Sequence, residues 1–116
     1  AAQAIINEKA PFWVACFHAQ QAAEKALKAA QIHFIQDFRK EHDLEILLNS
    51  LEGKIDIESI RQECIDLTDY YVTTRYPDIK ESELTTKDAL AALKMAKKIL
   101  DFVKKVIKYV RNSPTI

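Results

Sequence analysis

The stretch FHAQQAAEKALKA, residues 17–29, decides the fold because almost every residue in it favours an α-helix. Pro11 precedes the stretch, and proline is well suited to the first turn of a helix. The same composition of Ala, Gln, Glu, Lys and Leu continues past the quoted residues. We therefore predict one long helix from about Phe12 to Ile35.

Two rows of side chains lie next to each other on this predicted helix. The apolar row consists of Phe12, Cys16, Ala23, Leu27, Ala30 and Phe34. The small-residue strip consists of Ala15, Ala19, Ala22, Ala26 and Ala29. Because small side chains let a neighbouring helix approach closely, the strip predicts tight packing against a second helix.

The chain contains one glycine and three prolines, each of which lies at the boundary of a stretch of helical periodicity. A chain of 116 residues is large enough for one hydrophobic core. We therefore predict a single all-α domain over residues 1–116, an up-and-down bundle of four to five helices. Residues 1–9 are expected to form a short helix or the end of a longer one.

Particular residues are predicted to bound the later helices. They are Asp43 and Asp56 as N-caps, Gly53 as a left-handed residue after a helix, and Pro77 as a stop. Thr85, with Asp88 three residues later, resembles a capping box and is expected to open the last helix.

The last predicted helix has a wide apolar surface. Its main row is Thr86, Ala89, Leu93, Ala96, Leu100, Val103, Ile107 and Val110, and Met95, Ile99, Phe102, Val106 and Tyr109 widen it. An apolar arc of about half the circumference is more than one neighbour usually covers. We expect this helix to pack against two other helices or against a second subunit.

The chain carries 17 Lys and Arg against 17 Asp and Glu, so its total charge gives no support to general polyanion binding. The distribution is uneven. Residues 87–111 hold eight bases and two acids, a net charge of +6, whereas residues 37–69 hold ten acids and four bases, a net charge of −6. Such polarity is typical of a protein with a charged partner or a self-complementary dimer. RNA binding is weakly supported, because Phe102 and Tyr109 fall toward the apolar side rather than among the lysines.

Cys16 and Cys64 both fall on apolar helical rows, which predicts buried free thiols and a reducing, cytoplasmic location. His18 and His33 are roughly 22 Å apart along one helix and cannot share a metal. His42 is expected to be a turn or capping residue. No apolar run is long enough to span a membrane. We expect no metal, no cofactor and no catalytic residue.

Further information comes from four segments in order: FHAQQAAEKALKA (17–29), EHDLEILL (41–48), YYVTTRYPD (70–78) and TTKDALAALKMAKKIL (85–100). Together they resemble the HEPN domain family, the higher eukaryote and prokaryote nucleotide-binding domain, over about residues 10–110. The resemblance implies a helical bundle that often forms homodimers. It also implies a partner, since members are commonly encoded beside a minimal nucleotidyltransferase as a two-component or toxin–antitoxin pair.

Some members of this family are metal-independent ribonucleases, in which an arginine is followed four to six residues later by a histidine. Such a pair suits RNA cleavage, because histidine transfers protons and arginine stabilises phosphate charge. After Arg75 the corresponding positions are Ile79, Lys80 and Glu81. Arg39 and Arg61 also lack a histidine at this spacing. The ribonuclease signature is absent, which argues against an enzyme without excluding one.

Four residues are therefore candidates for binding a nucleotide or a partner: Arg75, Asp78, Lys80 and Lys25. Arg75 and Lys80 could bind a phosphate, with Asp78 orienting Arg75. Arg75 equally suits a structural role, because a cation in the last turn of a helix interacts with its free carbonyls. Lys25 lies on the predicted polar face with Lys28, where Glu24 can pair with Lys28.

We accordingly expect a non-catalytic HEPN protein, a homodimeric nucleotide-binding or interaction subunit that works with a minimal nucleotidyltransferase. One alternative is a ribonuclease with a degenerate site around Tyr71, Arg75 and Lys80. Another is a purely structural bundle that dimerises through Met95, Phe102 and Tyr109.

Overall fold

The structure, a computed structural model, describes residues 12–37, 40–75 and 86–111. These residues form the helices α2 (Phe12–Ile35), α3 (Leu44–Asn49), α4 (Arg61–Arg75) and α6 (Thr86–Arg111), with a short 3₁₀ helix η1 (Ile57–Ile60) before α4. The predicted all-α class is confirmed. Within the described residues, no helix is both long and apolar enough to cross a membrane.

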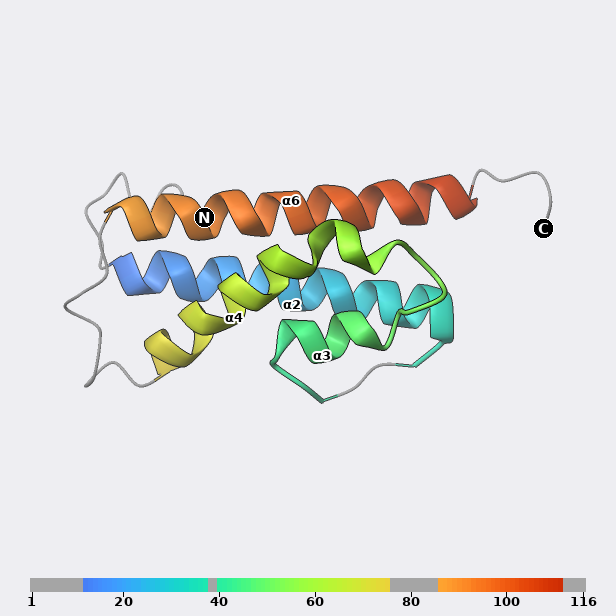
Figure 1. The fold of residues 1–116 in the computed structure, drawn as a ribbon, viewed down its shortest axis with the longest axis horizontal. Helices are drawn as coiled ribbons and strands as arrows, with labels where there is room; N and C mark the ends of the chain where they lie inside the picture. The colour runs from blue at the N-terminus through green and yellow to red at the C-terminus, as the bar shows by residue number, and fades with distance from the viewer. Residues whose placement is uncertain (1–11, 38–39, 76–85, 112–116) are drawn as a thin grey trace.

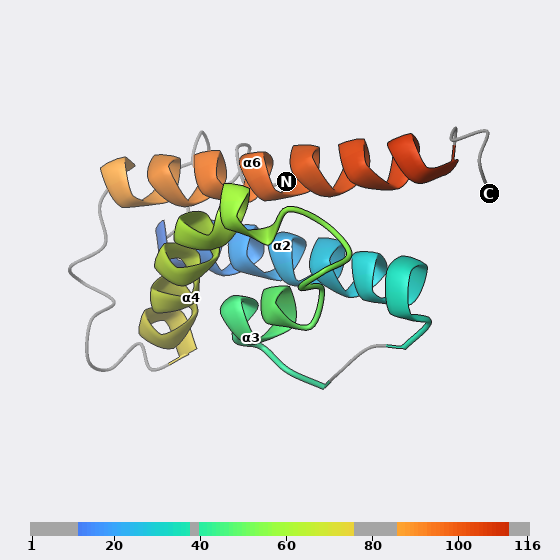
Figure 2. The ribbon, with the colours of Figure 1, turned by 45° about the vertical axis from the view of Figure 1, so that its right-hand side comes forward.

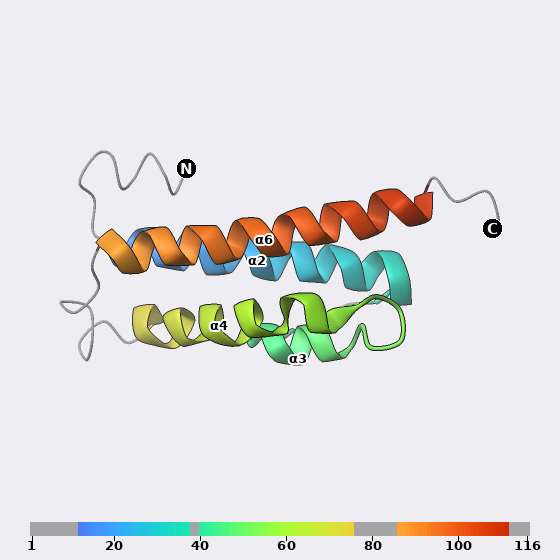
Figure 3. The same ribbon diagram turned by 45° about the horizontal axis from the view of Figure 1, so that its top comes forward.

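The two longest helices, α2 and α6, lie side by side and run in the same direction (Figure 1). Helix α4 runs back toward the start of α2, so that these three helices alternate up, down and up. Helices α3 and α4 lie next to each other along one side of the α2–α6 pair (Figures 2 and 3). The other side of that pair is therefore not covered by α3 or α4.

Helix α2 has the bounds that the sequence predicts. It begins directly after Pro11 and ends at Ile35. Gln36 then adopts a left-handed conformation with φ of 59°, and its backbone N–H donates to the Ile32 carbonyl over 3.1 Å. A left-handed residue after the last turn is a common helix ending, although glycine is more usual there.

The turns around α3 confirm two predictions and correct a third. The Asp43 carboxylate caps α3 by accepting from the backbone N–H groups of Glu45 and Ile46, and Gly53 has φ of 83°. Asp56, by contrast, makes no side-chain cap. Its carbonyl instead accepts from the Ser59 hydroxyl and N–H, at 2.7 and 3.3 Å, which closes a tight 3₁₀ turn before α4 begins.

The core lies where α2, α3, α4 and α6 meet. Its largest fully buried apolar side chains are Leu27, Leu44, Leu47, Leu48, Leu51, Ile60, Leu67 and Ile99. On α6 the fully buried row runs through Ala92 and Ile99, whereas Leu93 and Leu100, expected at the centre of the row, are only partly buried. Small alanines lie at the centre because α6 approaches α2 closely there.

Helix α6 packs against both α2 and α4, as the width of its apolar surface predicts. Met95 and Phe102 are partly buried and pack against the core of the same chain. Next to them, the Lys98 ammonium forms an ion pair with Glu63 of α4 over 2.7 Å. This side of α6 therefore faces α4.

Candidate functional site

Three of the four predicted site residues lie at or beyond the end of α4. Arg75 is the last residue of that helix, and Asp78 and Lys80 lie outside the described residues, as do Pro77 and Thr85. A phosphate site at the RYPD turn therefore stays a prediction. The fourth residue, Lys25, is exposed on α2 and lies within the described residues.

Lys25 lies at the edge of a groove between α2 and α6, which we call the α2–α6 groove. Its main part has a volume of about 820 Å³ and is lined by Ala22, Lys25, Ala26, Ala29, Leu100, Val103, Lys104, Ile107 and Lys108. A second hollow of about 580 Å³ shares Ala22, Lys25, Leu100 and Lys104 with it. This hollow extends along both helices to His18 and Leu93. The two parts form one continuous feature.

The floor of the groove is apolar because of the residues that the two helices bring together. Helix α2 contributes Ala22, Ala26 and Ala29, members of the predicted small-residue strip, and α6 contributes Leu100 and Ile107. The alanines are too short to fill the space between the helices. Leu100 and Ile107 are consequently left partly exposed instead of fully buried.

The edges of the groove are basic. Lys25 on α2 faces a row on α6 that includes Lys97, Lys104 and Lys108, all of them exposed. The one acid among the lining residues, Asp101, forms an ion pair with Lys97 over 2.6 Å. The main part of the groove contains three lysines and no acid. It therefore combines an apolar floor with positive charge at its edges.

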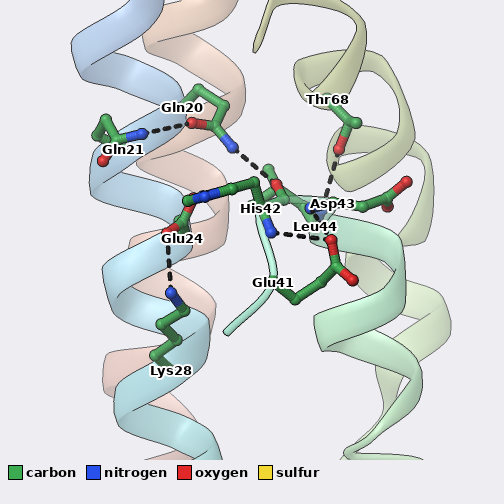
Figure 4. Close-up of polar contacts among 9 residues, drawn as sticks. All are labelled: Gln20, Gln21, Glu24, Lys28, Glu41, His42, Asp43, Leu44 and Thr68. Carbon is green, nitrogen blue, oxygen red and sulfur yellow. Dashed lines mark hydrogen bonds and ion pairs between the residues drawn. The ribbon is translucent and has the colours of Figure 1, made fainter. Parts of the chain in front are cut away.

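The opposite side of α2 carries buried polar groups, which we call the polar seam: Gln20, Glu24 and Gln31 of α2 with the residues that they bond. Figure 4 shows Gln20 and Glu24 with their partners. The Gln20 amide donates to the His42 carbonyl over 3.0 Å. The Gln31 amide donates to the Ser50 hydroxyl over 2.7 Å. Both hydrogen bonds join α2 to the segment that contains α3.

Glu24 is the charged member of the seam. Its carboxylate lies 3.0 Å from the His42 ring nitrogen and 2.9 Å from the Lys28 ammonium. Burial alone would raise the pKa of Glu24, but the hydrogen bonds from His42 and Lys28 outweigh it and hold the pKa below its usual value. The predicted pair of Glu24 with Lys28 is confirmed, but Glu24 is buried rather than on a solvated face.

Two further side chains, Glu41 and Thr68, hold the loop before α3. Glu41 accepts from the backbone N–H groups of His42 and Asp43, at 2.9 and 3.1 Å. On α4, the Thr68 hydroxyl accepts from the Leu44 N–H over 3.1 Å and donates to the Cys64 carbonyl. His42 is thus a turn residue, as predicted. Neither hollow of the α2–α6 groove includes it, and its described contacts are those of a structural link.

Sequence reasoning missed the burial of Gln20, Glu24 and Gln31. A signal was present: each lies three or four residues from a member of the apolar row, such as Ala23 or Leu27, so each borders the buried face. It also missed that Lys25 and the α6 lysines share one groove. That proximity depends on the register between two helices far apart in the chain.

Both cysteines are free and buried, as predicted. Burial raises the pKa of the Cys16 thiol to about 11 and that of Cys64 to about 12, so both stay protonated and unreactive at neutral pH. Over residues 12–37, 40–75 and 86–111, no three His, Cys, Asp or Glu side chains are grouped to hold a metal ion.

Comparison with known proteins gives one match. A sequence model of the HEPN domain matches residues 1–106 of the 116-residue chain. No curated protein and no solved structure matches the chain.

Proposed function

The chain belongs to the HEPN domain family, and from that premise we propose that it is a non-catalytic interaction subunit for a separate minimal nucleotidyltransferase. The pair would form a two-component or toxin–antitoxin system. The family supplies the expected partner, and the α2–α6 groove supplies the observation that favours an interaction role.

The groove has the chemistry of a protein-docking surface. Its main part is lined by alanine, leucine, valine, isoleucine and lysine side chains, without an aromatic ring or a buried polar group. Nucleotide sites usually orient their ligand through a few convergent polar groups, and bases commonly stack on aromatic rings. Apolar contact surrounded by charge is instead typical of protein interfaces. This difference favours protein binding over nucleotide binding at this surface.

The absence of the family's ribonuclease signature supports a non-catalytic role. Ile79, Lys80 and Glu81 occupy the positions where an active member has its histidine after the arginine. His42, next to α3, is engaged with Glu24. A degenerate ribonuclease remains the alternative, and metal-independent cleavage of single-stranded RNA that Arg75→Ala abolishes would replace the proposal.

The proposal is tested by affinity purification of the tagged protein from its own host, with mass spectrometry of the proteins that accompany it. A nucleotidyltransferase recovered near one-to-one is the expected result. Recovery of this chain alone would contradict the partner role. A thermal-shift series with nucleotides, run in parallel, tests the nucleotide-binding alternative directly. A clear shift that Lys25→Ala removes would favour that alternative.

The proposed subunit is a homodimer, as members of this family often are. Light scattering on the purified chain measures its mass. Phe102→Asp tests dimerisation through α6. Because Phe102 also packs against the core of its own chain, the melting temperature of this variant must be measured as a control. Dimer loss with little change in melting temperature would place Phe102 in the dimer interface.

A further inference from the structure

The residues that line the α2–α6 groove repeat every seven residues on both helices. On α6 the partly buried Leu93, Leu100 and Ile107 are seven residues apart, and on α2 Ala22 and Ala29 have the same spacing. Seven residues make nearly two turns, so such residues form a straight row along a helix. Two straight apolar rows facing one hollow are the surface against which a third helix packs in a coiled-coil arrangement.

The length of the groove sets the size of the occupant. Leu93 and Ile107 both line it, and at 1.5 Å per residue they lie about 21 Å apart along α6. A helix of about four turns would cover that distance. The short alanines on α2 leave room for leucine-sized side chains on the incoming helix.

The positive charges at the edges of the groove determine which charges a bound helix must carry. Lys97 and Lys104 lie four residues after Leu93 and Leu100, the position beside a hydrophobic seam where coiled coils place interhelical ion pairs. Lys25 contributes a further positive charge from α2. An incoming helix therefore needs glutamate or aspartate next to its apolar row.

A second copy of this chain fits the groove poorly. A two-fold dimer through the groove would bring the same lysines of both copies together, and like charges at an interface are unfavourable. The chain has acids on its other face, where Arg61 already bridges Glu45 and Glu58 at 3.1 and 2.8 Å. A contact between that face and the groove would join unlike surfaces, which need not close into a dimer.

We infer that the α2–α6 groove receives an acidic amphipathic helix of a partner protein. The inference rests on the proposed interaction role, because it names the part of the partner that binds. It does not require the partner to be a nucleotidyltransferase.

The test uses the full chain and a labelled synthetic peptide of about 21 residues with leucine at the a and d positions of each heptad and glutamate at e and g. A second peptide carries lysine in place of every glutamate. Fluorescence anisotropy measures both affinities at low and at high salt. The acidic peptide should bind at least about tenfold more tightly than the basic one, and added salt should reduce the difference.

The groove variant is Lys104→Glu with Lys108→Glu, and the matched control is Lys94→Glu with Lys105→Glu on exposed positions of the same helix outside the groove. Both variants change the net charge equally. The groove variant should weaken binding of the acidic peptide at least about tenfold and the control less than about threefold. Ala29→Leu fills the groove without changing charge and should also weaken binding. Circular dichroism melts confirm that each variant is folded.

Several results would overturn the inference. Equal losses in the groove and control variants would show nonspecific attraction to a basic helix. Dissociation of a homodimer by the groove variant would identify a second copy as the occupant. Tighter peptide binding after Ile5→Asp with Ile6→Asp would identify residues 1–11 of the same chain.

The two proposals can fail separately. If a nucleotidyltransferase co-purifies with the original chain but the acidic peptide binds no more tightly than the basic one, the proposed function stands and the groove inference fails. If the acidic peptide binds selectively but no nucleotidyltransferase is recovered, the groove inference stands and the partner assignment fails.

Discussion

The two sides of α2 differ in whether other parts of the chain cover them. On the polar seam, Gln20, Glu24 and Gln31 are buried, and each has a partner in the segment before or after α3. On the α2–α6 groove, the short side chains of Ala22 and Ala29 leave a hollow flanked by lysines. The seam therefore stabilises the fold, whereas the groove is the surface that we propose for a partner.

The hydrogen bonding of the polar seam is also complete. Among the described residues, no buried side-chain nitrogen or oxygen lacks a hydrogen-bond partner. A buried polar group without a partner costs about 1–3 kcal/mol, so the seam specifies one position for the loop before α3. The lysines of the groove carry no such penalty, because they remain exposed to water.

The largest effect should come from Leu27, which is fully buried between the two sides. Leu27→Ala leaves a cavity in the core and should lower the free energy of unfolding by about 3 kcal/mol. Urea denaturation measures the loss. A loss below about 1 kcal/mol would mean that the two sides do not share one core.

The next largest loss of stability should come from the polar seam. Gln31→Ala removes the hydrogen bond to Ser50 and leaves a gap at a fully buried position, so it should cost about 2 kcal/mol. The matched control is Gln62→Ala on the exposed surface of α4, which should change stability by less than about 0.5 kcal/mol. Similar losses in the two variants would contradict a special role for the seam.

The charge in the seam predicts a pH dependence. Because the folded-state pKa of Glu24 is lowered, its contribution is present above the unfolded-state pKa of about 4.5 and is lost as pH falls through the folded-state value. Glu24→Gln should therefore cost about 1–2 kcal/mol at pH 7, and the difference from the original chain should shrink below pH of about 4.5. Urea melts from pH 7 to pH 3 measure it. A constant difference across this range would contradict the assignment.

The smallest effect should come from the groove. Lys104 and Lys108 are four residues apart, so their like charges repel by a few tenths of a kcal/mol. Lys108→Gln should leave the stability unchanged or raise it by up to about 0.5 kcal/mol at low salt, while weakening partner binding. A loss above about 1 kcal/mol in urea denaturation would mean that the groove lysines are structural.

The helix bounds were largely predictable because they depend on local chemistry. Pro11 and the residues after it predict the start of α2, Asp43 predicts the cap of α3, and Gly53 predicts a left-handed turn. The prediction of Asp56 as a side-chain cap was wrong, because Ser59 donates to the Asp56 carbonyl and the Asp56 side chain makes no cap. Two local hydrogen-bonding arrangements competed there, and composition alone does not choose between them.

The candidate site was predictable in part. Lys25 was identified as a candidate on its own helix, and the lysines of α6 were identified as a charged face. Their common groove depends on the register of α2 against α6, which no single segment contains. The same reason explains the missed burial of Glu24, whose partner His42 lies in a different segment of the chain.

The side-by-side packing of α2 and α6 also has a consequence for biosynthesis. Helices α2 and α6 are the first and the last that the structure describes, so the described contacts on the α6 side of α2 cannot form until residues 86–111 have been made. Contacts between distant parts of a sequence form late, because a long loop must close first. The core, in which Ala19 and Ala23 are buried, is therefore completed only after α6 has left the ribosome.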